Sequence, residues 1–263
     1  MAGKGGKGLL AGKTTAANKD KDKKRPVSRS SRAGLQCLSM EDDKILSYND
    51  VVLRRSDLGI LRGQEFLNDR IIEFYFSYLD SGCSSQDILL VPPSISFWIM
   101  NCPFPDSLKD FVEPLKLPEK RVVIFSINNN TDVSLAQGGT HWSLLAYEKN
   151  SKVFVHHDSM GNSNQRYAKK LYRDVVGFMG DSESGSSEIS LSECPIMPQQ
   201  MNGYDCGLYV TAIAKLICDW YKNGGSTNNE ELWFSALKEV KPQMVSNMRS
   251  DILMLIQDLM VKK

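Results

Sequence analysis

Apolar positions recur at helical spacing in several stretches of this chain and fill short β-rich runs in others. Residues 67–79 follow the helical period, with Asn68 or Asp69 as the N-cap. The apolar segment from Cys206 to Tyr221 predicts a second helix, buried on much of its circumference. Further helices are expected over residues 94–100, 107–115, 165–179, 229–240 and 243–261.

β-Branched and aromatic residues concentrate in three runs, which predict strands over 121–128, 141–147 and 152–158. A short polar turn joins the last two runs into a predicted hairpin. A fourth strand is expected over 192–197, after a polar loop at 181–190. Helices and strands mixed in this way, without an internal repeat, predict an α+β domain over residues 45–263.

The predicted hairpin carries His141 near its start and Asp158 at its end. If the turn is centred on Lys149 and Asn150, His141 lies directly opposite Asp158, with Cβ atoms roughly 5 Å apart. If the turn is centred on Asn150 and Ser151, the two residues are diagonal neighbours at roughly 7–8 Å, still within reach. Either register puts an imidazole and a carboxylate on one face of the sheet.

Cys206 stands at the start of the predicted apolar helix, with Asp205 as the expected N-cap. The positive end of the helix dipole and a nearby protonated histidine both favour a thiolate there. The preceding Gly-containing turn is expected to present the thiol to solvent, and Gly207 allows a backbone or substrate to approach closely. Gln200 is a candidate oxyanion donor, together with the backbone N–H of Cys206. A base, an acid and a thiol are the components of a cysteine hydrolase.

Each of these residues also has a plainer interpretation. His141 and Asp158 alone resemble an ordinary cross-strand polar pair, and His156 and His157 are rival bases on the second strand. Most free cysteines are small core residues, which is what we expect of Cys218. The occurrence of histidine, acid and cysteine motifs together favours catalysis.

Short motifs extend the pattern along most of the chain: Leu46-Ser47-Tyr48, Leu67-Asn68-Asp69, Leu117-Pro118 with Arg121-Val122-Val123, Ile127-Asn128, Gly138-Gly139-Thr140-His141-Trp142-Ser143-Leu144-Leu145, and Tyr204-Asp205-Cys206-Gly207. Together they resemble the Ulp/SENP-type cysteine proteases, which act on ubiquitin-like modifiers. The resemblance spans residues 44–262 and is strongest to the deneddylase branch, which cleaves the Nedd-type modifier called Rub in plants.

The resemblance implies a papain-like cysteine protease fold of the Ulp/SENP type and a role for each motif residue. His141 becomes the base, Asp158 the acid that orients it, Cys206 the nucleophile and Gln200 the oxyanion donor. No cofactor or metal is implied. The reaction is cleavage after the C-terminal Gly-Gly of a Nedd/Rub-type modifier, in precursor processing and deconjugation.

The resemblance also implies a narrow tunnel with aromatic walls for the Gly-Gly tail. Trp142 matches one wall, and Phe66 stands where related enzymes usually have a Trp. Asp69 matches an acid that pairs with the modifier's basic tail. Three alternatives stay open: a SUMO-specific protease of the same family, an acyltransferase with the same Cys/His chemistry, and an inactive module that only binds a modifier.

Charge divides the chain into two parts. Residues 1–36 hold ten Lys or Arg and two Asp, a net charge of +8, whereas the other 227 residues hold 22 basic and 29 acidic groups, a net −7. The basic segment has no apolar period, so we expect it to be disordered and followed by a linker at 37–44. It resembles the N-terminal tail of a plant variant histone of the H2A class, and its charge suits weak binding of nucleic acid.

Size and cysteine usage set the remaining expectations. A chain of 263 residues with 41% apolar content can bury a sizeable core. Its six cysteines show neither metal-ligand spacing nor a disulfide framework, and no apolar run is long enough to span a bilayer. We expect a monomer in the cytoplasm or nucleus, where a catalytic thiol stays reduced.

Overall fold

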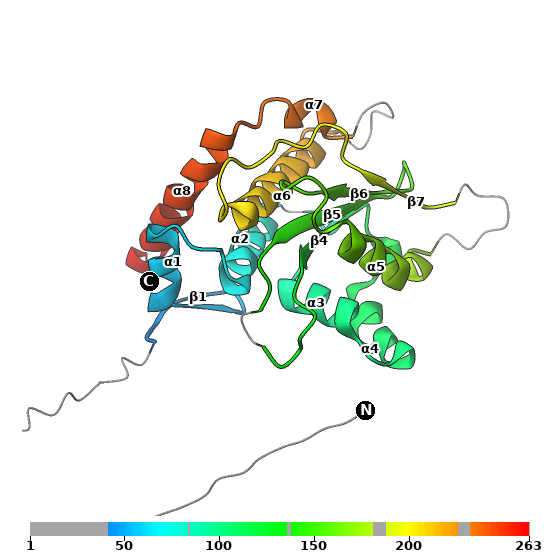
Figure 1. Ribbon diagram of the computed structural model, residues 1–263, viewed down its shortest axis with the longest axis horizontal. Coiled ribbons are helices and arrows are strands. Elements are labelled where there is room, and N and C mark those ends of the chain that lie inside the picture. Colours follow the sequence, from blue (N-terminus) through cyan, green and yellow to red (C-terminus); the bar gives the residue numbers. More distant parts are fainter. Residues whose placement is uncertain (1–41, 84, 136–137, 181–187, 226–231, 263) are drawn as a thin grey trace, which may run out of the picture. The chain divides into compact units, whose positions relative to one another are not determined.

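A computed structural model describes residues 42–83, 85–135, 138–180, 188–225 and 232–262 (Figure 1). Its strands are β1 (Lys44–Tyr48), β2 (Val51–Arg54), β3 (Ile88–Val91), β4 (Val122–Asn128), β5 (Trp142–Glu148), β6 (Val153–His157) and β7 (Ser190–Glu193). Its helices are α1 (Arg55–Arg62), α2 (Asp69–Ser81), α3 (Pro93–Asn101), α4 (Leu108–Val112), α5 (Gln165–Val175), α6 (Cys206–Lys222), α7 (Phe234–Leu237) and α8 (Pro242–Val261). The predicted α+β class is confirmed.

A mixed five-stranded sheet in the order β3-β4-β5-β6-β7 forms the centre of the fold. The inner pairs β4–β5 and β5–β6 are antiparallel, and the outer pairs β3–β4 and β6–β7 are parallel. Every residue of β4 and β5 is buried, because helices cover both faces of the sheet. Near-continuous apolar runs are typical of strands buried on both faces.

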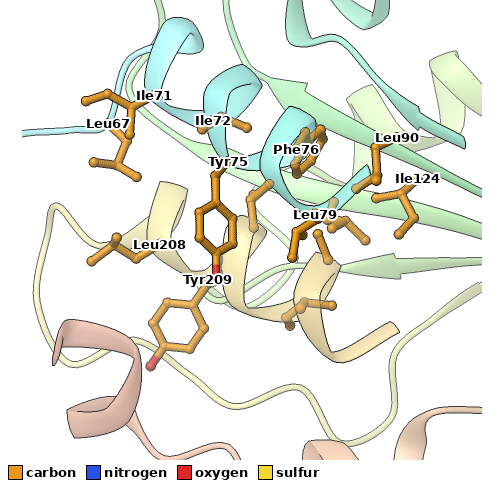
Figure 2. Close-up of a cluster of buried hydrophobic side chains, with 14 of the residues drawn as sticks. Leu67, Ile71, Ile72, Tyr75, Phe76, Leu79, Leu90, Ile124, Leu208 and Tyr209 are labelled. Carbon is orange, nitrogen blue, oxygen red and sulfur yellow. The ribbon is translucent and has the colours of Figure 1, made fainter. Parts of the chain in front are cut away.

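Alternate residues of the central strands face two separate hydrophobic cores. Ile124, Leu144 and Val155 pack with α2 and α6, whereas Phe125 and Leu145 pack with α3 and α5. Figure 1 shows these two pairs of helices on opposite sides of the sheet. Figure 2 shows the first core, in which apolar side chains of α2 point toward those of α6. The amino end of α6 is thereby held between α2 and the central strands.

Several elements lie where the sequence did not predict them. The β1–β2 hairpin, α1 and β3 were not expected at all. The last predicted strand is wrong in position, since β7 covers Ser190–Glu193 and residues 194–197 are not strand. Of the helix predicted over 229–240, only α7 is described as helix.

The predicted amino-terminal division of the chain stays a prediction. Residues 1–36, with the predicted disordered tail, and most of the linker 37–44 lie outside the described residues. Within the described part of the linker, Asp42 and Asp43 accept hydrogen bonds from Ser56 and Arg55, and Lys44 is the first residue of β1. The last linker residues therefore contact the folded domain.

The β5–β6 hairpin settles the register that the sequence left open. Leu144 pairs with His157 and Glu148 with Val153, so the loop holds four residues, 149–152. The directly opposed alternative is wrong and the diagonal one is confirmed: extended past the strands, this register makes Asp158 a diagonal neighbour of His141. The loop closes through a hydrogen bond from the Lys152 N–H to the Lys149 carbonyl.

Among the helices that the structure describes, none is long and apolar enough to cross a bilayer.

Candidate active site

His141 and Asp158 meet at the end of the central hairpin, just outside β5 and β6. Their side chains are joined at 2.6 Å, from the imidazole Nε2 to the carboxylate Oδ1, and both residues are buried. The carboxylate also accepts hydrogen bonds from the backbone N–H groups of Met160, at 2.9 Å, and Asn164, at 2.7 Å. These donors outweigh burial and lower the pKa of Asp158, so it is a fixed negative charge against the imidazole.

The environment of His141 favours the imidazolium form. Burial of the ring opposes its charge, but the hydrogen bonds and negative charges of Asp158 and Cys206 prevail and raise the pKa of His141 to about 9. Its other nitrogen, Nδ1, makes no well-aligned hydrogen bond within the described part of the chain. In the imidazolium form that nitrogen carries the second proton, which can come from the Cys206 thiol and be passed on from there.

Cys206 is the first residue of α6, as predicted, but it is not presented to solvent. Its exposed fraction is 0%, because neighbouring side chains, among them Trp142 at the start of β5, cover it. Leu67 lies so close to Gly207 that a methyl group on Gly207 would contact the Leu67 side chain at 2.8 Å. The close approach expected at Gly207 is thus made by a side chain. An acyl group can reach the thiol only when the covering side chains move.

Asp205 holds the N-cap position of α6 without capping the helix through its side chain. The predicted N-cap position is therefore confirmed, but the carboxylate bonds other partners instead of the helix end: Arg249 at 2.9 Å, Ser246 at 2.6 Å and Asn202 at 2.8 Å. These hydrogen bonds lower the pKa of Asp205 despite its burial. The turn before Cys206 is consequently tied to α8.

Gln200 lies in the loop before α6 and is held at both ends of its amide. Its Oε1 accepts a hydrogen bond from the Ser159 hydroxyl at 2.7 Å, and its Nε2 donates to the Asn202 carbonyl at 2.6 Å. The backbone N–H of Gln200 donates to the Ser159 carbonyl, which pins the loop beside Asp158. An amide nitrogen has two hydrogens, so one remains for an oxyanion.

The three predicted substrate residues lie on two neighbouring segments. The Trp142 indole is almost buried and donates from Nε1 to the Leu67 carbonyl at 2.8 Å, which joins β5 to the segment before α2. Phe66, the preceding residue, leaves 43% of its surface exposed. Asp69 is the first residue of α2 and accepts a hydrogen bond from the Arg70 backbone N–H, while Asn68 is the N-cap.

The rival histidines have structural partners instead. His156 contacts the carboxylate of Glu193 at 2.7 Å and the hydroxyl of Ser143 at 3.0 Å. His157 is buried beside Trp233, whose indole N–H donates to its Nε2 at 3.1 Å. Burial, with a smaller contribution from His156, lowers the pKa of His157 to about 3. Neither ring contacts the thiol in the way that His141 does.

Several residues of the site were not predicted from the sequence. The Asn129 side chain accepts from the backbone N–H groups of Thr140, at 2.7 Å, and His141, at 3.1 Å, and so sets where β5 begins. Asn164 is fully buried and donates to the His141 carbonyl at 3.3 Å. Three consecutive asparagines after a buried strand, at 128–130, were the one available signal for Asn129.

Gly139 has a positive φ of 83°, and an added Cβ would clash with the side chain of Asn128. The glycine pair before His141 thus serves the turn into β5.

No group of three or more His, Cys, Asp or Glu residues within the described ranges could hold a metal ion. A thiol beside an imidazole that a carboxylate orients can attack an acyl carbon and form a thioester, and this arrangement defines a thiol-dependent hydrolase.

Comparison with known proteins identifies the family. Residues 106–219 match the model of the Ulp1 protease family, C-terminal catalytic domain. The chain is 51% identical over 220 residues to NEDD8-specific protease 1 of Arabidopsis thaliana, covering 84% of this chain and 95% of that protein. The chain therefore belongs to the Ulp1 protease family and is a cysteine peptidase.

Two further similarities are to a solved protease domain and to a histone. The yeast Ulp1 protease domain, solved in complex with Smt3, the yeast ortholog of SUMO, superposes with a TM-score of 0.59 at 21% identity, over 84% of this chain and 90% of that one. This likeness confirms the predicted fold. The chain is also 76% identical over 38 residues to histone H2A variant 1 of Arabidopsis thaliana; these residues are 14% of this chain and 28% of the histone. The predicted histone resemblance is confirmed.

Proposed function

We propose that this protein is a deneddylase, which cleaves after the C-terminal Gly-Gly of a Nedd/Rub-type modifier. The observation that carries the chemistry is the buried 2.6 Å contact between His141 and Asp158, with Cys206 beside the same ring. The modifier class is supported by the similarity to a protease named for NEDD8. Both precursor processing and deconjugation break a bond at the same glycine carbonyl, so one site serves both.

In the proposed reaction His141 takes the Cys206 proton and the thiolate attacks the glycine carbonyl. The resulting oxyanion accepts hydrogen bonds from the Gln200 amide and the Cys206 backbone N–H. The imidazolium then returns its proton to the leaving amine, which gives a thioester on Cys206. A water molecule, deprotonated by His141, attacks the thioester and releases the modifier with a free carboxylate, and the thiol recovers its proton.

The substrate side of the proposal rests on Trp142, Phe66 and Asp69. Trp142, the proposed aromatic wall, donates a hydrogen bond to the carbonyl of Leu67, the residue after Phe66, and this contact supports the proposal. Asp69 lies at the start of α2, three residues after Phe66, where a carboxylate can pair with a basic residue of the modifier's tail. Asp69→Ala should therefore raise KM.

A panel of fluorogenic Rub, ubiquitin and SUMO substrates tests the function. We expect the highest kcat/KM on Rub, weak turnover of ubiquitin and little of SUMO. Cys206→Ala should abolish cleavage while leaving modifier binding largely intact, because the side chain is small and the fold does not depend on the thiol. Comparable kcat/KM on SUMO and Rub would contradict the preference, and substantial turnover by Cys206→Ala would overturn the assignment of the nucleophile.

We infer a separate role for residues 1–36 from their net charge of +8: weak, salt-sensitive binding of nucleic acid. The catalytic domain would act as a monomer in the cytoplasm or nucleus. Deleting residues 1–36 should keep kcat/KM within about twofold and weaken binding to DNA at low salt, since counterion release drives such binding. Loss of catalysis on deletion would show that the segment belongs to the catalytic fold.

A further inference from the structure

Arg249 of α8 joins two segments that flank the candidate nucleophile. Figure 1 shows α8 beside α1 and the amino end of α6, although it comes last in the chain. The Arg249 side chain is almost buried, with a side-chain exposure of 10%. A buried guanidinium carries five donors in a fixed plane, so its partners determine its position and it determines theirs.

The first segment that Arg249 contacts is the turn before Cys206. Its Nη2 donates to the Asp205 Oδ1 at 2.9 Å, and the guanidinium lies 5.5 Å from the centre of the Tyr204 ring. Ser246, one turn earlier on α8, donates to the other oxygen of the same carboxylate at 2.6 Å. Two residues of α8 thus hold the residue that immediately precedes the thiol.

The second segment comprises the end of α1 and the connection from α1 to α2, residues 60–68. Arg249 donates from Nη1 to the Ile60 carbonyl at 2.8 Å and from Nη2 to the Glu65 carbonyl at 3.0 Å. Glu65 directly precedes Phe66 and Leu67, the residues that carry the exposed aromatic ring and cover the start of α6. One side chain therefore contacts both the segment that carries Phe66 and the turn that precedes Cys206.

We propose that Arg249 is a positioning residue that sets the spacing between the Phe66 segment and the Cys206 turn, and thereby the fit of the modifier's tail. The inference deepens the proposed function and rests on it. On the side of residues 60–68, Arg249 bonds only backbone carbonyls. A substitution at Glu65 would therefore leave these hydrogen bonds in place, and only a change at Arg249 can remove them. A lysine at 249 has three donors on a single nitrogen and cannot reach acceptors spread over two segments as the guanidinium does.

Steady-state kinetics per titrated active site test the proposal. Arg249→Met keeps the apolar stem and removes the donors; we expect KM for the Rub substrate to rise about tenfold, with kcat changed less than KM. Arg249→Lys should give a KM between those of the wild type and Arg249→Met. If Arg249→Met fails to fold, Arg249→Lys is the variant that tests the proposal. A purely structural role would lower the fraction of active enzyme and leave KM unchanged, which would overturn the proposal.

Ser246→Ala is the matched control, because it removes a hydrogen bond from the same helix to Asp205 without touching residues 60–65. Its KM should stay within about twofold of wild type. If Ser246→Ala raised KM as much as Arg249→Met, the effect would pass through Asp205 alone and the link would be wrong.

Hydrogen–deuterium exchange gives a readout that does not need turnover. Arg249→Met should speed exchange of the amides in 63–68 and in 204–208 by about tenfold, whereas Ser246→Ala should affect only the second group. Unchanged exchange in 63–68 would contradict the link. The two ideas can fail separately. If Arg249→Met speeds exchange as expected but the wild-type protein cleaves no modifier, the link through Arg249 holds and the proposed function fails.

Discussion

Two buried histidines at the ends of one hairpin show how a site differs from a core. His141 and His157 are both almost inaccessible, yet the pKa of His141 is raised to about 9 and the pKa of His157 is lowered to about 3. Both rings are penalised by burial, but only His141 contacts a carboxylate, while His157 accepts a hydrogen bond from the neutral indole of Trp233. A buried histidine keeps its charged form only where a fixed negative charge compensates for lost hydration.

The largest effect should come from exchanging these histidines for glutamine. His141→Gln should lower kcat by about a thousandfold or more, because members of a catalytic triad act as a unit. His157→Gln should leave kcat/KM within about threefold and destabilise the fold by about 1–3 kcal/mol, since the Trp233 N–H loses a well-placed acceptor. Measuring turnover and urea unfolding of both variants checks these two expectations. Equal losses of activity would contradict the assignment of different roles to His141 and His157.

Asp158→Asn sharpens the comparison from the side of the carboxylate. The amide keeps the shape but not the charge, so His141 loses the partner that orients and stabilises its imidazolium. We expect kcat to fall by about a hundred- to ten-thousandfold, a smaller or equal loss than that of His141→Gln. The pH dependence of kcat should also differ from that of the wild type, because the charge of Asp158 no longer raises the pKa of His141. Unchanged turnover would mean that the pair is only structural.

The pH dependence of stability should have opposite signs for the two rings. Because the pKa of His141 is about 9 in the fold and 6.5 in the unfolded chain, its contribution is complete below pH 6.5 and is lost as pH rises toward 9. The pKa of His157 is about 3 in the fold, so its contribution is present above pH 6.5 and is lost as pH falls toward 3.

Urea unfolding of wild type and both glutamine variants between pH 4 and 9 measures these contributions. The stability difference between wild type and His141→Gln should shrink only on the alkaline side, and the difference for His157→Gln only on the acidic side. Slopes of the same sign would show that the two environments are equivalent.

The proposed reacting groups were easier to predict from the sequence than the residues that hold them in place. His141, Asp158 and Cys206 could be found because period-2 runs fix which side chains share a sheet face and a long apolar run fixes where a helix begins. The exact hairpin register was beyond reach, since a four-residue turn and a two-residue turn fit the same polar stretch. In the structure the loop holds four residues, and its last residue, Lys152, adopts a positive φ of 49°.

The partners of Asp205 and the cover over Cys206 could not be predicted, for a different reason. Arg249 and Ser246 lie more than forty residues away and reach Asp205 only through the packing of α8 against α1 and α6. The local sequence pattern predicts that the Asp205 side chain caps the helix. It cannot predict that the Arg249 guanidinium binds this carboxylate instead. The β1–β2 hairpin escaped notice because its strands are short, five and four residues, and are only partly buried.

Labelling with an electrophile tests the central claim most directly. A Rub modifier that carries a C-terminal electrophile should form one covalent adduct at pH 7, and peptide mapping should place it on Cys206. The adduct should form far more slowly with His141→Gln and at the wild-type rate with His157→Gln. An adduct on any of the other five cysteines, or equal rates in the two histidine variants, would contradict the assignment of Cys206 and His141 as nucleophile and base.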